Sequence, residues 1–155
     1  CHNIHGHIID QHTADMHRLF EELPRYRPDA KTIGVGDGAN EIGMGSIPWE
    51  ALHCRLEGEQ AARVPCRIAT DFNLLAGVSN WAAYALAQAA CRLRGQADAI
   101  VWSDPRAQHQ LIETLVAEAG AVDGMTGRRE TTVDGLVMDD YLRIFSDIAR
   151  LAAMR

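Results

Sequence analysis

The sequence lacks the usual features of membrane and secreted proteins. No apolar run approaches the ~18 residues that a membrane-spanning helix needs, and no charged-then-apolar leader is present. The four cysteines are widely spaced and form no Cys-x-x-Cys pair, so neither a thiolate zinc site nor a disulfide framework is indicated. We therefore expect a protein of a reducing compartment, the cytoplasm, that does not act on membranes.

Basic charge is also scarce. The chain has 15 Lys and Arg against 21 Asp and Glu, which gives a formal net charge of −6. No basic stripe is present where a phosphate backbone would lie, which excludes nucleic acid as a partner and favours small metabolites or cations. The length of 155 residues, 47% of them hydrophobic, suits one compact domain over residues 1–155 and leaves a homo-oligomer open. The polar, histidine-rich start at Cys1 is typical of the middle of a longer protein.

Alternating apolar patterns predict an α/β fold. Helices are expected over residues 10–23, from Trp49, over 79–93, from Pro105 and from Met138; strands are expected over 32–35, 64–69 and 99–102. Short connections between them favour a layered α/β/α arrangement with a mainly parallel sheet. An aspartate follows each expected strand: Asp37, Asp71 and Asp104. If the strands are parallel neighbours, these acids lie at the sheet edge where ligands bind.

The segment Thr32–Gly45 places Asp37, Asn40 and Glu41 among glycines directly after an expected strand. Glycine lets a backbone approach a ligand closely, and a helical turn would put both carboxylates on one face. Oxygen ligands of this kind suit Mg²⁺, Mn²⁺ or Ca²⁺ better than zinc. The alternative is that Asp37 caps a helix and Glu41 is solvated; the number of glycines favours a functional loop.

Other motifs give weaker signals. Gly34-x-Gly36-x-x-Ala39 matches the loose dinucleotide fingerprint, but an aspartate in that loop would lie where pyrophosphate meets backbone N–H groups. The histidines near the start fit no zinc spacing. Ser79 and Asn80 begin an expected helix whose N-terminus could hold a carboxylate, unless Ser79 only caps it. Asp104, followed by proline, is expected to be a helix cap.

The loop over residues 123–136 alternates glycines with acids and threonines, which predicts an ordered loop; two ordinary turns are the alternative.

Three long motifs carry a resemblance to a known family. They cover residues 33–45, residues 76–81 with 84–86, and residues 120–130 with 133–136. Together they resemble the D-glutamate cyclase C-terminal-like family, in order and over nearly the whole chain. The chain is similar to the carboxyl half of that domain, the C-terminal portion of a larger D-glutamate cyclase-like domain, which leaves open whether this half is active alone. Ala39 stands where the family usually has another glycine.

The resemblance implies a lyase that interconverts D-glutamate and 5-oxo-D-proline with loss of water, and a divalent cation, Mn²⁺ or Mg²⁺. It also implies a small-molecule substrate, D-glutamate or a related acid, and a mitochondrial location for eukaryotic members. We hypothesise catalysis by Asp37, Glu41 and Asp123, a cation on Asp37, Glu41 and Asp71, and substrate binding by Asn40, Ser79, Asn80, Glu130 and Asp134. A metal-dependent phosphoester hydrolase and a noncatalytic metabolite-binding domain are the alternatives.

Overall fold

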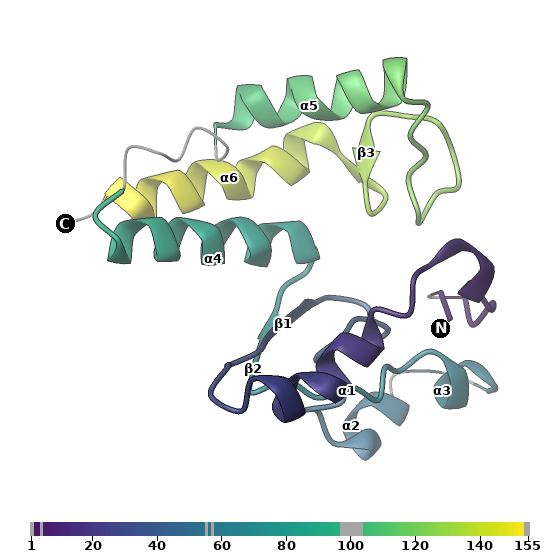
Figure 1. The fold of residues 1–155 in the computed structure, drawn as a ribbon. Helices are drawn as coiled ribbons and strands as arrows, with labels where there is room; N and C mark the ends of the chain where they lie inside the picture. Colours follow the sequence, from purple (N-terminus) through teal and green to yellow (C-terminus); the bar gives the residue numbers. More distant parts are fainter. Residues whose placement is uncertain (1, 4, 55, 57, 97–103, 154–155) are drawn as a thin grey trace. The chain divides into compact units, whose positions relative to one another are not determined.

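The computed structural model describes residues 2–3, 5–54, 56, 58–96 and 104–153. The chain divides into two compact units, Cys1–Ala82 and Ala83–Arg155, which are treated separately below (Figure 1). Among the described residues, no helix combines the length and the apolar character needed to cross a membrane.

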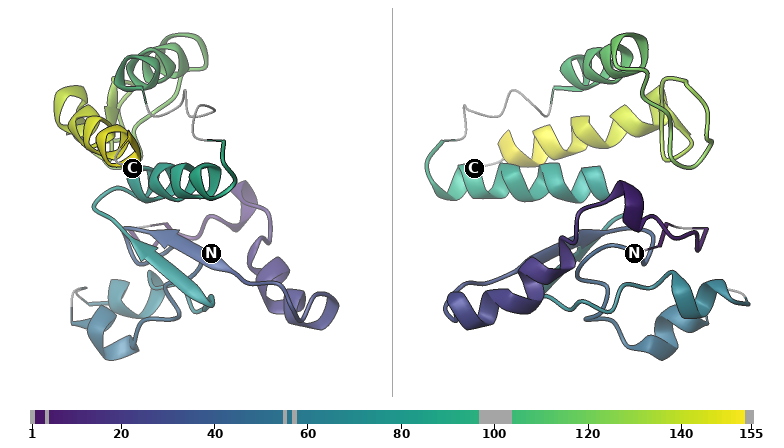
Figure 2. Two further views of the ribbon diagram at one scale, coloured as in Figure 1. Left: turned by 90° about the vertical axis from the view of Figure 1, so that its left-hand side faces the viewer. Right: turned by 45° about the vertical axis from the view of Figure 1, so that its right-hand side comes forward.

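The first unit is built around two parallel strands, β1 (Ile33–Gly36) and β2 (Phe72–Leu75). Ile33 pairs with Phe72 and Gly36 with Leu75, so the strands are in register over their full length. The remaining elements are the 3-10 helix η1 (Asp10–His12) and the helices α1 (His17–Tyr26), α2 (Trp49–His53) and α3 (Gln60–Arg63). Figure 2 shows α1 on one side of the two strands and the short helices α2 and α3 on the other.

The expected strand over residues 64–69 is wrong. That segment instead runs beside the glycine-rich loop: the Cys66 N–H donates to the Ala39 carbonyl at 2.8 Å, and the Gly43 N–H donates to the Ile68 carbonyl at 2.9 Å. Within this segment, Ala69 forms isolated bridges to Gly43 and Met44, and the second strand begins at Phe72. Asp71 therefore precedes its strand and does not follow one.

The first helix also differs from its sequence pattern. It begins at His17 and continues to Tyr26, past Pro24, which lies inside the helix. Pro24 has no N–H to donate to the Phe20 carbonyl, so α1 lacks that hydrogen bond, and the helix ends two residues later. The Arg27 N–H still closes the helix by donating to the Leu23 carbonyl at 2.8 Å.

The second unit packs helices and one hairpin. Its elements are α4 (Ser79–Leu93), which begins in the first unit, α5 (Pro105–Glu118), β3 (Thr132–Val133), β4 (Leu136–Val137) and α6 (Met138–Ala153). Tyr141 and Phe145 of α6 are fully buried, and the Phe145 ring meets the edge of Tyr84 with centroids 5.0 Å apart. These aromatic contacts form the core of this unit.

Several expected helix boundaries are confirmed. Asp104 caps α5 by accepting the Arg106 N–H at 3.0 Å, and Pro105 occupies the first helical position. Gly95, at φ +70°, follows the end of α4 as the pattern predicts. The expected strand over residues 99–102 lies outside the described residues. The α/β prediction is confirmed as a mixed fold of helices, one parallel strand pair and one antiparallel pair, while the layered arrangement stays a prediction.

Candidate acidic site in the glycine-rich loop

Asp37 follows β1 directly and reaches the start of α4. Its Oδ2 atom accepts a hydrogen bond from the backbone N–H of Ser79, the first residue of that helix. The positive end of a helix dipole favours a negative charge at this place. The helix start that was expected to hold a substrate carboxylate thus already holds a carboxylate of the protein, since the donor of Ser79 is used by Asp37.

Glu41 lies beside Asp37 in the loop. Its Oε1 atom accepts the Gly38 N–H at 3.0 Å, whereas its Oε2 atom is buried and has no hydrogen-bond partner among the described residues. Burial raises the pKa of the Glu41 carboxyl, and the side-chain hydrogen bond and negative charge of Asp37 raise it further. The structure therefore brings Asp37 and Glu41 together as an interacting carboxyl pair.

The glycines around this pair have a packing role. A Cβ on Gly34 would lie 2.7 Å from the Gly43 Cα and 2.7 Å from the Ile42 carbonyl oxygen, and one on Gly45 would lie 2.3 Å from the Arg67 carbonyl oxygen. Gly43 also has φ +110°, which favours glycine. The number of glycines was taken as a sign of ligand binding, but close backbone packing accounts for these three.

Gly36 connects this packing to the acidic pair. A Cβ on Gly36 would lie 2.4 Å from the buried Met44 Cε and 3.1 Å from the Glu41 Oε2 atom. Glycine at this position therefore leaves the space that Glu41 occupies beside the end of β1.

Asp71 is not part of this group. It lies next to Thr32, before the strands begin, while Asp37 lies five residues further along β1, roughly 16 Å away at ~3.3 Å per residue. Its carboxylate accepts the Thr32 N–H at 2.9 Å, the Lys31 ammonium at 2.9 Å and the Thr32 hydroxyl at 2.8 Å. These contacts, the Thr32 backbone first, lower the pKa of Asp71 to about 2.

The expected three-acid cation site is therefore not assembled in this structure. Across the described part of the chain, no three His, Cys, Asp or Glu side chains form a group that could hold a metal ion. The sequence interpretation placed Asp71 after a strand, whereas Asp71 comes before β2 and pairs with Lys31.

Asp123 organises the loop of the second unit. Its side chain is 7% exposed, and its carboxylate accepts the N–H groups of Met125 at 2.8 Å and Thr126 at 2.9 Å. It also accepts the Thr132 hydroxyl at 2.6 Å and the Gly135 N–H at 3.0 Å. Burial acts to raise the pKa of Asp123, but the four hydrogen bonds outweigh it and hold the pKa at about 2. A carboxylate with this pKa and four donors is a poor proton acceptor, which argues against the catalytic role expected for it.

Glu130 and Asp134 also have local roles. The Glu130 carboxylate pairs with the Arg128 guanidinium through Nε at 3.1 Å and a terminal nitrogen at 3.1 Å, which lowers the pKa of Glu130. Asp134, at φ +51°, and Gly135, at φ +77°, form the two-residue turn between β3 and β4. A hairpin of this kind needs positive φ at both positions, and Asp-Gly is a preferred pair there. The reading of this loop as ordered agrees with these contacts.

Asn40 lies on a cavity of about 630 Å³ in the first unit, which Asp37 and Glu41 do not line. The same cavity is lined by His17, one of the histidines near the start of the chain that fit no zinc spacing. The spacing of His17 and Glu21, four residues apart on α1, was the available sign that they share one face and one cavity.

Similarity to known proteins extends over most of this chain. A family model described as D-glutamate cyclase-like, C-terminal, matches residues 1–149. A human protein, "D-glutamate cyclase, mitochondrial", is 44% identical over 60 residues, which is 39% of this chain and 9% of the human protein. The chain thus matches only a small part of the length of that relative.

Proposed function

The chain belongs to the D-glutamate cyclase-like C-terminal family, and we propose from this that it acts as a lyase on D-glutamate and 5-oxo-D-proline. The observation that supports the proposal best is the carboxyl pair of Asp37 and Glu41 at the end of β1. In this pair, burial and the neighbouring Asp37 raise the pKa of Glu41, so Glu41 takes up a proton more readily than an isolated carboxyl group. Such a pair can give one proton and take another.

Ring closure of D-glutamate needs both actions. The substrate ammonium must lose a proton before its nitrogen attacks the γ-carboxyl carbon and forms the new C–N bond. The C–O bond then breaks, and the oxygen leaves as water. The two protons that the ammonium loses in becoming an amide nitrogen are the two that the departing oxygen takes up, so the pair returns to its starting protonation.

We assign the proton donor to Glu41 and the proton acceptor to Asp37. Glu41 holds a proton more readily because it is partly buried next to another carboxylate. Asp37 is exposed, and the N-terminus of α4 favours its negative charge. Both reacting ends belong to one substrate molecule, so positioning them also lowers the barrier.

The divalent cation implied by the family resemblance, Mn²⁺ or Mg²⁺, remains part of the proposal. The fit is to two residues: Asp37 and Glu41 offer hard oxygen ligands, and the Glu41 Oε2 atom accepts no hydrogen bond from a donor in the described part of the chain. A bound cation would polarise the γ-carboxyl group of the substrate. It would compete with the proton on Glu41, so its affinity should rise with pH.

The test is the conversion of D-glutamate to 5-oxo-D-proline by this chain, followed by chiral chromatography with and without Mn²⁺. We expect Asp37→Asn and Glu41→Gln each to lower kcat by about 100-fold or more, because proton transfer contributes factors of this size. Asp71→Asn is the matched control, since Asp71 lies at the other end of the strands, and it should retain activity.

Two results would overturn this proposal. The first is no conversion by the unaltered chain in either direction, and the second is full activity of both variants of the pair. Hydrolysis of a phosphomonoester under Mn²⁺, without any turnover of D-glutamate, would favour a phosphoester hydrolase.

We also propose a reducing compartment, the cytoplasm, for this chain. Its support is that the described cysteines, Cys54, Cys66 and Cys91, are free thiols. The name of the human relative places that protein in mitochondria.

A further inference from the structure

A smaller cavity, of about 440 Å³, is lined by the end of the glycine-rich loop and by α2. Its volume is within the range of small-molecule sites. Neither Asp37 nor Glu41 belongs to its described lining, so the acidic pair does not supply its chemistry. Most of the described lining is apolar and consists of Met44, Ile47, Pro48, Trp49 and Leu52.

Arg67 is the one charged residue in the described lining of this cavity. Its guanidinium lies over the Trp49 ring, 4.1 Å from the ring centroid. Arg67 also borders the larger cavity that Asn40 lines, but Trp49 lines the smaller cavity and not the larger one, so the stacking contact places the guanidinium at the smaller cavity. Among the described residues, no acid forms an ion pair with this guanidinium.

Other polar groups of the described lining bond within the protein. The N–H groups of Gly45, Ser46 and Ile47 donate to backbone carbonyls at 3.1, 2.9 and 2.9 Å. The Ser46 hydroxyl donates to the Thr70 carbonyl and accepts the Thr70 N–H, both at 3.0 Å. The Arg67 guanidinium is therefore the strongest hydrogen-bond donor that this lining has left for a ligand, because a charged donor binds an anion more strongly than a neutral one.

We propose that this cavity binds a small organic monoanion, with its carboxylate at the Arg67 guanidinium and its apolar body against Ile47 and Leu52. A guanidinium stacked on an aromatic ring keeps the N–H groups at its edge, and these match the two oxygens of a carboxylate. One cation with no acid beside it balances one negative charge. D-Glutamate fits this site less well, because it has two carboxylates and the described lining holds no acid for its ammonium.

The test uses benzoate as the probe, since it joins one carboxylate to a flat apolar ring. Binding to the whole chain is followed by NMR at the indole N–H signal of Trp49, assigned from the Trp49→Phe spectrum. We expect this signal to shift saturably with a dissociation constant of about 1 to 5 mM, as a ligand of this size permits. The indole signal of Trp81, which lies on α4 outside the described lining, is the internal control. Acetate, benzyl alcohol and D-glutamate should each bind at least about fivefold more weakly.

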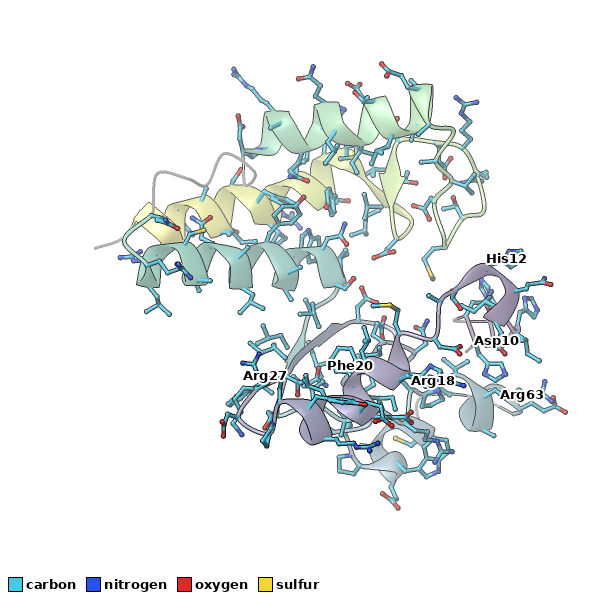
Figure 3. The ribbon with its side chains drawn as sticks, in the orientation of Figure 1. Asp10, His12, Arg18, Phe20, Arg27 and Arg63 are labelled. Carbon is cyan, nitrogen blue, oxygen red and sulfur yellow. The ribbon has the colours of Figure 1, made fainter. Side chains whose placement is uncertain are left out.

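A matched pair of variants locates the site. Arg67→Gln should weaken benzoate binding by about fivefold or more, because the carboxylate loses its charged partner. Arg63→Gln is the control: Arg63 lies on α3 (Figure 3), pairs with Glu59 at 2.9 Å and is outside the described lining of this cavity. It should keep the affinity within about twofold. Circular dichroism checks that both variants fold.

Three outcomes would each overturn the proposal. The first is no saturable shift of the Trp49 signal with benzoate up to about 20 mM, and the second is binding of benzyl alcohol or D-glutamate as tight as that of benzoate. Both are measured on the unaltered chain, so they do not depend on the folding of a variant. The third is unchanged affinity in Arg67→Gln, with or without a loss in Arg63→Gln. None of these measurements involves turnover, so a failure of the proposed lyase activity would leave them unchanged.

Discussion

Replacement of Asp123 by asparagine should destabilise the second unit severely. The carboxylate is 7% exposed and accepts hydrogen bonds from three backbone N–H groups and the Thr132 hydroxyl. In Asp123→Asn, one oxygen becomes an NH₂ group, which can donate but not accept. If the NH₂ group takes the place of Oδ2, the Thr132 hydroxyl can rotate to accept from it, but the Gly135 N–H loses its partner; in the other orientation the N–H groups of Met125 and Thr126 lose theirs. The variant has the same size, so packing changes little.

The magnitude follows from the pKa of Asp123. A decrease from the ordinary value of 3.8 to about 2 corresponds to about 2.5 kcal/mol, at ~1.36 kcal/mol per pH unit. Because the pKa is lower in the folded state, this stability is fully present above about pH 4 and is lost as the pH falls toward 2. The unpaired donors add to the loss, and we expect Asp123→Asn to lower the free energy of unfolding by about 2 to 4 kcal/mol at pH 7.

Urea denaturation followed by circular dichroism, at several pH values between 7 and 2.5, measures this difference. The matched control is Asp147→Asn, because Asp147 lies on the exposed face of α6 and pairs only with Arg150 among the contacts described for it, at 3.1 Å. It should change stability by no more than about 0.5 kcal/mol. A change below about 0.5 kcal/mol in Asp123→Asn at pH 7, or a difference that does not shrink in acid, would refute the reasoning.

Three further predictions concern the first unit. Ala39→Gly should raise the free energy of unfolding by about 0.5 to 1 kcal/mol, because Ala39 has φ +81°; urea titration checks this, and a loss of stability would contradict it. Gly34→Ala should lower the free energy of unfolding by about 2 kcal/mol or more, since the added Cβ would lie 2.7 Å from backbone atoms. Gly124→Ala is the control: a Cβ at Gly124 meets no atom within 4 Å, so the same assay should show almost no change. Asp71→Asn should lower the urea midpoint at pH 7 and lose this effect toward pH 2, because the pKa of Asp71 is about 2 in the folded state; a pH-independent effect would count against its pairing with Thr32 and Lys31.

Local signals in the sequence gave correct predictions wherever neighbouring residues decide the structure. Asp104 before a proline is a helix cap, and Gly95 follows a helix end, because both conformations depend on residues a few positions away. The order and type of the long helices α4, α5 and α6 were likewise predictable from apolar spacing.

Residues with distant partners could not be placed in this way. Asp71 was expected to follow a strand because residues 64–69 read as one. In the structure, the glycine-rich loop supplies the backbone hydrogen-bond partners of that segment. Pairing with β1 begins only at Phe72, after Asp71. The glycine pattern had two explanations, ligand approach and close packing, and the second becomes visible in the contacts of Gly34 with Gly43 and of Gly45 with Arg67. Asp37 and Glu41 were grouped correctly, but the helical turn expected between them is wrong, because residues 38–41 form a non-helical bend with Ala39 at φ +81°.

The hydrogen bond from Ser79 to Asp37 gives the acidic pair an independent reporter. Amide hydrogen exchange at Ser79 depends on whether the Asp37 oxygen is held there, so any event that neutralises or withdraws that carboxylate speeds exchange at the first turn of α4. Deuterium uptake at this single amide would register ligand arrival even in a protein too slow to turn over. A spectroscopist could therefore follow occupancy of the pair without product formation.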